Sequence, residues 1–252
     1  MYSVIIPSIG RYEFINELLI SLKNQTIKSD DIILILNNNC RHDKEIKLLK
    51  KVDDLRLIFN NFNLSEKRNL GARLSKNELI FFSDDDDIWY ENKAEFILPH
   101  LKKFDVVTHN FDKFGFNIKK NCSKLGDNNK VITKKFLLFG ENIFGGGSSI
   151  ITKKKVLLKK KFNSDLKLSE DFEWWIRVLL ANFKIFYVSK SLVKYRTHKN
   201  NMTYNSTKIY LSSILVTSKF FLSSFYGSFL FINSLIRNSI KLFLNFPFKI
   251  FK

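Results

Sequence analysis

Proline, glycine and cysteine are all scarce in this chain. It has 3 prolines and 9 glycines in 252 residues, which favours long regular elements joined by short loops. The 2 cysteines, Cys40 and Cys122, belong to no CxxC pair or Cys/His cluster, so the sequence offers no pattern for zinc. A reduced, cytoplasmic chain is the simplest interpretation. The first residues form an apolar run without a basic region or a cleavage site, so we expect that the protein is not exported.

Acidic residues are absent after Glu173, whereas lysine and arginine continue to Lys252. The formal net charge of +18 indicates nucleic acid, an anionic membrane surface or phosphate-bearing small molecules as partners. A hydrophobic fraction of 45% excludes a disordered chain, and 252 residues suffice for one α/β domain with an appendage. We expect a domain over residues 1–205 and a basic, aromatic-rich tail over 206–252.

Short apolar runs alternate with helical patterns in the first part of the chain. Strands are expected at residues 3–7, 31–36, 55–59 and 78–83, and helices at 12–24, 43–51 and 65–74, the last with Ser65 as N-cap. Continuous apolar strands between helices indicate a mostly parallel sheet covered on both faces. Such sheets bind ligands at the carboxyl ends of their strands. Polar groups follow three of these strands, at Pro7–Arg11, Asn37–Asn39 and Asp84–Asp87.

The second half of the chain is less regular. We expect a strand at 106–111, a basic loop or hairpin at 112–130, a helix at 169–182 with Ser169 as N-cap, and strand and loop at 185–198. Residues 206–252 are rich in Phe, Leu, Ile and Ser. The uncharged stretch Phe220–Ile236 lies at the lower limit for crossing a bilayer. Its composition favours an interfacial helix or helix pair over a span, and a hairpin packed on the domain or a dimer contact is the alternative.

Asp84, Asp85, Asp86 and Asp87 form the sharpest feature. Adjacent carboxylates repel one another and disfavour their own ionisation, and a divalent cation relieves that repulsion. Mg²⁺ or Mn²⁺ takes one or two carboxylates together with substrate phosphates. A solvated acidic turn is the alternative, but the run follows the buried stretch 79–82 and precedes an apolar pair.

The segment FFSDDDDIW resembles the DXD segment of GT-A-fold glycosyltransferases, and the whole layout resembles glycosyltransferase family 2. The resemblance implies a GT-A, Rossmann-like α/β fold in which Asp84 faces the ribose and sugar, Asp85 occupies the variable position and Asp86 binds the metal. It also implies a nucleotide-binding role for other residues, namely Pro7, Ser8, Arg11, Asn37, Arg68 and Asn69. The family commonly has Asp where Asn37 stands, which leaves uridine favoured but less firmly indicated.

Three later segments also resemble the family. In LSEDFEWWIRV, Asp171 matches the general base that an inverting transfer needs, Glu170 precedes it, and Trp174 is either an acceptor wall or core. Gly146, Gly147 and Ser148 match the segment that shapes the acceptor pocket, because glycine allows close backbone approach, or else form a flexible loop. In YRTHKNNMT, Arg196 matches a diphosphate contact and His198 a metal contact, with an exposed loop histidine as the alternative.

The resemblance implies an inverting, Mn²⁺- or Mg²⁺-dependent hexosyltransferase. It would move a hexose or N-acetylhexosamine, of glucose or galactose type, from a UDP-sugar to a lipid-diphosphate-linked saccharide, with a β-linked product. Such enzymes commonly build lipopolysaccharide O-antigen or capsule repeat units, here at the inner face of the cell membrane through the basic tail. We expect no nucleic acid partner. A basic nucleic-acid-binding protein or metal nuclease, a scaffold with a decayed site and a nucleotidyltransferase are the rival hypotheses.

Overall fold

A computed structural model describes residues 1–116, 125–199, 201 and 206–244. The strands are β1 (Ser3–Pro7), β2 (Asp31–Leu36), β3 (Leu55–Phe59), β4 (Leu79–Phe82), β5 (Ile88–Trp89), β6 (Val106–Gly115), β7 (Lys130–Ile132), β8 (Ile151–Lys153) and β9 (Ile185–Thr197). The α-helices are α1 (Tyr12–Lys23), α2 (Asp43–Leu49), α3 (Leu64–Leu74), α4 (Lys93–Ile97), α5 (Lys154–Lys159), α6 (Glu170–Leu180), α7 (Ser206–Ser218) and α8 (Phe225–Leu244). Short 3₁₀ helices are η1 (Asn38–Cys40), η2 (His100–Lys102), η3 (Lys134–Phe139) and η4 (Gly147–Ser149).

The strands form one sheet in the order β3-β2-β1-β4-β8-β6-β9-β5, with β7 also paired to β9. The pairs among β1, β2, β3 and β4 are parallel, as the apolar runs predict, and β6 pairs parallel with β9. Strand β8 is antiparallel to β4 and β6, while β5 and β7 are antiparallel to β9. The sheet is therefore mixed, and its parallel half comes from the first part of the chain.

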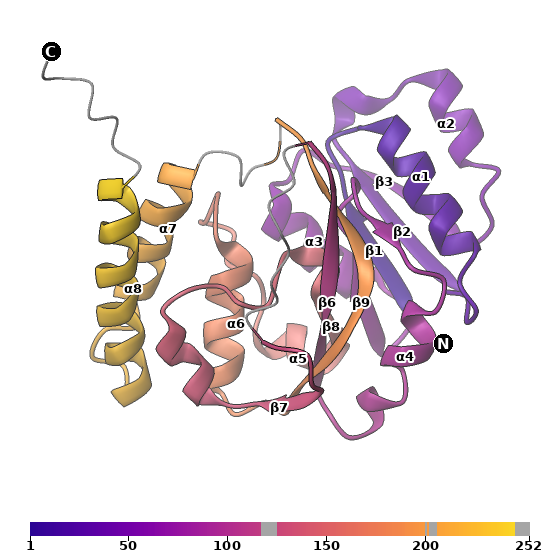
Figure 1. Ribbon diagram of the computed structural model, residues 1–252. Helices are drawn as coiled ribbons and strands as arrows, with labels where there is room; N and C mark the ends of the chain where they lie inside the picture. Colours follow the sequence, from indigo (N-terminus) through magenta and orange to yellow (C-terminus); the bar gives the residue numbers. More distant parts are fainter. Residues whose placement is uncertain (117–124, 200, 202–205, 245–252) are drawn as a thin grey trace, which may run out of the picture.

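Side chains along β1 alternate between two apolar cores, one on each face of the sheet. Helices α1 and α2 lie on one side of the sheet, and α3, α5 and α6 lie on the other (Figure 1). Val4 and Ile6 pack with α1, α2 and α4, whereas Ile5 packs with α3, α5 and α6. Side chains alternate between the two faces of a strand, and both faces of β1 are fully buried. Burial on both faces accounts for the continuous apolar runs of the sequence.

One helix has a different N-cap from the expected one, and a second has the expected N-cap residue without a capping hydrogen bond. Asn63, not Ser65, is the N-cap of α3: its side chain accepts the Glu66 amide at 3.0 Å, and the Glu66 carboxylate accepts the Asn63 amide at 2.8 Å. This capping box satisfies two orphan donors at once. Ser169 stands at the N-cap position of α6, but its φ of +59° is left-handed and its side chain makes no capping hydrogen bond.

Helices α7 and α8 lie side by side next to α6, away from the sheet (Figure 1). They are anchored to the domain by Ser212 Oγ, which donates to Leu168 O at 3.1 Å, and by Asn233 Nδ2, which donates to Leu138 O at 2.8 Å. The expected domain boundary at residue 205 lies within 202–205, outside the described residues. Residues 117–124 of the expected basic loop, which include Cys122, also lie outside them. Over the described ranges, no helix is both long and apolar enough to cross a bilayer.

Candidate active site

Lysine 67 ties together the carboxyl ends of β1 and β2. Its ammonium group donates to the backbone oxygen of Ser8 and to Oδ1 of Asn37, both at 2.6 Å. Lys67 is buried, and burial lowers the pKa of its ammonium group while nearby Cys40 and Asp85 oppose that shift. Pro7 ends β1 and is buried beside Ser8. Lys67 did not stand out in the sequence, since a lysine in the first turns of a helix is ordinarily exposed.

Arginine 11 pairs with two members of the aspartate run. Its guanidinium group contacts Asp85, which also accepts the Ser8 hydroxyl, and its Nη1 lies 2.7 Å from Asp86 Oδ2. Burial raises the pKa of the Asp85 carboxyl, although Arg11 and Ser8 act in the opposite direction. His198 Nε2 lies 3.0 Å from Asp86 Oδ2 and 3.1 Å from Arg11 Nη1. Residues distant in sequence, which the motifs singled out separately, therefore meet at one point.

Arginine 196 fastens the end of β9 to the aspartate run. Its amide donates to Asp87 Oδ1 at 3.1 Å, and its Nε donates to the backbone oxygen of Asp86 at 2.8 Å. Its guanidinium group also contacts Glu17 at 2.5 Å and lies 4.5 Å from the ring of Phe14. Asp87 is fully buried, and burial together with its acidic neighbours raises the pKa of its carboxyl well above the ordinary value. These contacts set the position of the segment that carries His198.

A single buried arginine links the aspartate run to helix α6. Arg68, on α3, donates from Nη2 to Asp84 Oδ1 at 3.0 Å and from Nη1 to Glu170 Oε1 at 2.7 Å. Its side chain is 2% exposed, so both ion pairs are shielded from water on the arginine side. The carboxylates at the end of β4 and at the start of α6 therefore lie within hydrogen-bond reach of one guanidinium group.

Aspartate 171 occupies the first turn of α6 beside Glu170. Its Oδ1 accepts the Phe172 amide at 2.7 Å, and its Oδ2 accepts Nδ2 of Asn142 at 3.1 Å. Burial raises the pKa of the Asp171 carboxyl to about 7, and the charge of Glu170 adds to the rise while Arg68 opposes it. A carboxyl group with a pKa near neutrality can take and release a proton under ordinary conditions. Asn142 did not stand out in the sequence.

The glycine-rich segment lies against Asp84 and Arg68. The Ser148 hydroxyl accepts the amide of Asp84 at 2.9 Å. A Cβ at Gly147 would collide with the Arg68 guanidinium group and would lie 2.5 Å from Asp84 Oδ1, whereas at Gly146 its nearest neighbour would be Asp84 Oδ2 at 3.4 Å. Glycine at 147 thus permits the close approach of the backbone.

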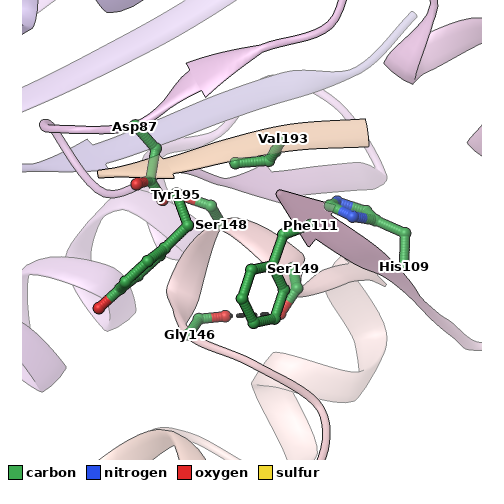
Figure 2. A pocket seen from close by; sticks show the side chains of 8 residues that line it. All are labelled: Asp87, His109, Phe111, Gly146, Ser148, Ser149, Val193 and Tyr195. Carbon is green, nitrogen blue, oxygen red and sulfur yellow. Dashed lines mark hydrogen bonds between the residues drawn. The ribbon is translucent and has the colours of Figure 1, made fainter. Parts of the chain in front are cut away.

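A small pocket opens beside the glycine-rich segment (Figure 2). Gly146, Ser148 and Ser149 line it next to Asp87 and Tyr195, with His109 at the opposite end; Phe111 and Val193 complete the lining. His109 is buried, and burial lowers the pKa of its imidazole well below the ordinary value, with Lys93 adding to the effect. A neutral His109 beside the site adds no charge to it.

Two residues of the predicted site have their side chains engaged elsewhere. Asn69 forms a two-way hydrogen bond with the backbone of Phe162, at 2.8 and 2.9 Å, and so joins α3 to the segment before α6. Trp174 is fully buried, stacks on Phe162 with ring centroids 5.2 Å apart, and donates its indole N–H to Lys160 O. Asn69 therefore serves to connect two segments of the domain. Trp174 serves packing, because α6 presents its aromatic face to the core.

Asp86 and His198 are the two predicted residues that could hold a divalent cation between them. The Asp86 carboxylate is the kind of oxygen ligand that Mn²⁺ and Mg²⁺ prefer, whereas the His198 imidazole nitrogen, 3.0 Å away, suits a transition metal better than Mg²⁺. Substrate phosphate oxygens ordinarily complete such sites. No group of three or more His, Cys, Asp or Glu side chains suited to a metal occurs among the described residues. Arg11 shares the same Asp86 oxygen, so binding of a cation requires that Arg11 turn away from it.

Comparison with known proteins identifies relatives. A family model described as "Glycosyl transferase family 2" matches residues 3–159. An uncharacterized glycosyltransferase of Haemophilus influenzae is 28% identical over 79% of this chain and 66% of its own length, so the chain spans about two thirds of that relative. A Campylobacter jejuni protein named GalNAc(5)-diNAcBac-PP-undecaprenol beta-1,3-glucosyltransferase is 28% identical over 83% of this chain and 70% of its own.

The fold is shared with a solved structure. Residues 1–349 of TarS from Staphylococcus aureus, in complex with UDP-GlcNAc, superpose with a TM-score of 0.75 over 98% of this chain and 76% of that chain. The sequence identity is 15%, so this likeness concerns the fold alone. The GT-A, Rossmann-like fold expected from the sequence is confirmed.

Proposed function

The chain belongs to glycosyl transferase family 2, and from that membership we propose that it is an inverting, metal-dependent glycosyltransferase. It moves a hexose or N-acetylhexosamine, of glucose or galactose type, from a nucleotide sugar to a saccharide carried on a lipid diphosphate. UDP is the favoured nucleotide, since the TarS structure that shares the fold holds UDP-GlcNAc. The observation that carries the proposal is the buried bridge from Asp84 through Arg68 to Glu170, next to Asp171.

The donor side of the site is the edge where β1, β2 and β4 end. Asp84 faces the ribose and the sugar, while Ser8, Asn37 and Asp85 line the nucleotide, with Lys67 holding the first two in register. Arg11 and Arg196 supply positive charge for the diphosphate. A divalent ion held by Asp86 and His198 would neutralise charge on the leaving nucleoside diphosphate when it is bound.

The acceptor side is the start of α6. Asp171 takes the proton of the acceptor hydroxyl, which attacks the anomeric carbon on the face opposite the leaving group and forms the new C–O bond as the bond to the diphosphate breaks. One displacement inverts the anomeric centre, so an α-linked donor gives a β-linked product. A pKa of about 7 suits Asp171 to this task, because a base is most effective when its pKa lies near the working pH. Gly146, Gly147 and Ser148 shape the pocket between the two sides.

The proposed acceptor is a polyprenyl-diphosphate saccharide, as in O-antigen or capsule synthesis. The Campylobacter relative supports it, because its name gives a PP-undecaprenol acceptor and a beta-1,3 linkage. Helices α7 and α8 support it independently. Large apolar side chains lie exposed on this pair and its connecting turn, namely Leu211, Leu215, Phe221, Leu222, Phe225, Phe229, Ile232, Leu235, Ile236, Ile240, Phe243 and Leu244.

The charged side chains on or between these two helices are all positive, namely Lys208, Lys219, Arg237 and Lys241, and the sequence has no acidic residue after Glu173. Two of them, Arg237 and Lys241, also pair with Glu141 of the domain. An apolar surface with basic side chains complements the interface of a membrane that contains anionic lipids. A second copy of the same face would instead bring like charges together. We therefore assign the pair to peripheral contact at the inner face of the membrane.

The proposal is tested with a panel of nucleotide sugars, Mn²⁺ and a lipid-diphosphate N-acetylglucosamine acceptor, followed by mass spectrometry of the lipid product. Wild type is compared with Asp86→Ala and with the matched control Asp127→Ala, which alters an acid at the turn before β7. We expect transfer from one donor, lost on chelation and in Asp86→Ala but kept in the control. Absence of both transfer and nucleotide release with every donor would refute the proposal.

A further inference from the structure

Asparagine 142 has a fully used side-chain amide. Its Oδ1 accepts the Phe144 amide at 3.0 Å, which fixes the orientation of the group. Nδ2 then directs one hydrogen to the Gly145 oxygen and the other to Asp171 Oδ2, each at 3.1 Å. Two backbone partners therefore determine where the third bond points, and that bond reaches the carboxylate at the start of α6.

The residues immediately before Asn142 are fixed by α8. Gly140 packs so closely on this helix that a Cβ there would lie 2.6 Å from the backbone nitrogen of Ser234. Glu141 then pairs with two basic side chains on successive turns of α8, Arg237 at 2.7 Å and Lys241 at 3.3 Å. Three consecutive residues thus connect the C-terminal helix to Asp171.

We propose that Asn142 is a positioning residue that orients the Asp171 carboxylate toward the acceptor, and that α8 holds Asn142 in place through Gly140 and Glu141. The assignment of a base to Asp171 rests on the proposed function; the contact itself does not. Asp171 Oδ1 is already held by its own helix through the Phe172 amide, so Asn142 restrains the other oxygen. A carboxylate restrained at both oxygens keeps one orientation, which favours proton transfer from a bound hydroxyl.

The contact has a chemical consequence that can be measured. A hydrogen bond donated to a carboxylate favours its charged form, so loss of the Asn142 bond raises the pKa of Asp171. Asn142→Ala removes the donor, and Asn142→Asp keeps the size of the side chain while placing a like charge beside Asp171. Both changes act in the same direction, and the second guards against an effect of lost volume.

The experiment titrates the Asp171 carboxyl carbon by carbon-13 NMR in the full chain, and Asp171→Asn identifies its signal. The pH profile of transfer is measured on the same proteins. Asn129→Ala is the matched control, since Asn129 accepts hydrogen bonds from Ser189 of β9, and neither of these bonds involves Asn142 or Asp171. In both Asn142 variants we expect the titration midpoint of Asp171 to rise by about half a pH unit or more. The acid limb of the rate profile should move with it. At pH 7, kcat should fall about tenfold while the KM for the donor stays unchanged.

Removal of the two ion pairs between Glu141 and α8 separates the role of α8 from the role of Asn142. Arg237→Ala combined with Lys241→Ala leaves Asn142 intact, and we expect a smaller shift of the same sign. An unchanged titration in this double variant would overturn the role of α8, and an unchanged titration in both Asn142 variants would overturn the role of Asn142. If wild type transferred no sugar, the titration would still show whether Asn142 influences the pKa of Asp171. Failure of the proposed function can therefore be told apart from failure of this inference.

Discussion

Arg68 and Glu170 form a buried ion pair of 2.7 Å that joins helix α3 to the first residue of α6. The other arm of the guanidinium group reaches Asp84, at the end of β4. One side chain therefore fixes the separation between Asp84 and Glu170, the residue next to the proposed base Asp171. The surrounding charges raise the pKa of the Arg68 guanidinium although burial acts to lower it, so it stays charged.

Replacement of Arg68 should both destabilise the protein and abolish transfer. Arg68→Met leaves Asp84 and Glu170 without their common partner, and removal of one member of a buried pair typically costs about 3–5 kcal/mol. Arg73→Met alters an exposed arginine of the same helix and should leave the unfolding midpoint nearly unchanged. Chemical denaturation of both variants measures the difference. Equal stability of the two would mean that the bridge contributes little.

Two neighbouring glycines should respond differently to the same change. Gly147→Ala forces a Cβ against Arg68 and Asp84, whereas Gly146→Ala meets its nearest atom at 3.4 Å. We expect Gly147→Ala to reduce transfer at least about tenfold, since small displacements of reacting groups have large effects on rate. Gly146→Ala should retain most activity. Steady-state kinetics at matched enzyme concentration tests the pair, and equal losses would contradict the geometry.

The raised pKa of Asp171 predicts opposite pH effects on rate and on stability. Transfer needs the deprotonated base, so kcat/KM should fall about tenfold per pH unit well below 7. The folded protein holds a proton on Asp171 that the unfolded chain releases near its ordinary pKa, so this group's contribution to stability is present at low pH and lost as pH rises through about 7.

Thermal unfolding of Asp171→Asn checks the second effect. Relative to wild type, the variant should be more stable at pH 8 than at pH 5 by roughly 5–10 °C in the unfolding midpoint, because two pH units below a pKa of about 7 correspond to about 2.7 kcal/mol. The same difference at both pH values would show that the carboxyl group titrates in its ordinary range.

The exposed face of α7 and α8 should bind anionic vesicles. We expect cosedimentation with vesicles of phosphatidylglycerol and phosphatidylethanolamine, weaker binding to phosphatidylcholine, and partial release by salt. Leu222→Ser together with Phe225→Ser should weaken binding, because Leu222 is 81% exposed and Phe225 67%. Leu48→Ser, on α2 with 51% exposure, is the control. A dimer that shows no vesicle affinity would assign the face to self-association.

The first half of the fold was predictable because its signal is local. The strands at 3–7, 31–36 and 55–59 have the expected bounds, since parallel strands covered on both faces appear as largely apolar runs. The first two are fully buried, and the third, at the end of the sheet, is partly buried. The strand at 106–111 continues to Gly115, and 185–197 is one long strand. Their polar outer ends pair with each other, and only the tertiary structure brings those partners together.

Residues of the candidate site could be predicted where they belong to a sequence motif. They could not be predicted where their position depends on tertiary packing. Asp84, Asp86 and Asp171 stood out by type and spacing. Lys67 and Asn142 did not, because their roles depend on partners about 30 residues away in sequence. Asn69 matched a pattern, yet its amide closes on the Phe162 backbone, a contact that no local sequence feature announces.

The role of Asp171 as the base is tested most directly by two measurements on one preparation of Asp171→Asn. Calorimetry measures donor binding, and a transfer assay measures sugar transfer to the lipid acceptor. We predict a donor affinity close to that of wild type and transfer reduced at least about a hundredfold, since Asn cannot accept the proton. Transfer at the wild-type rate would contradict the central claim, because the proton would then leave by another route.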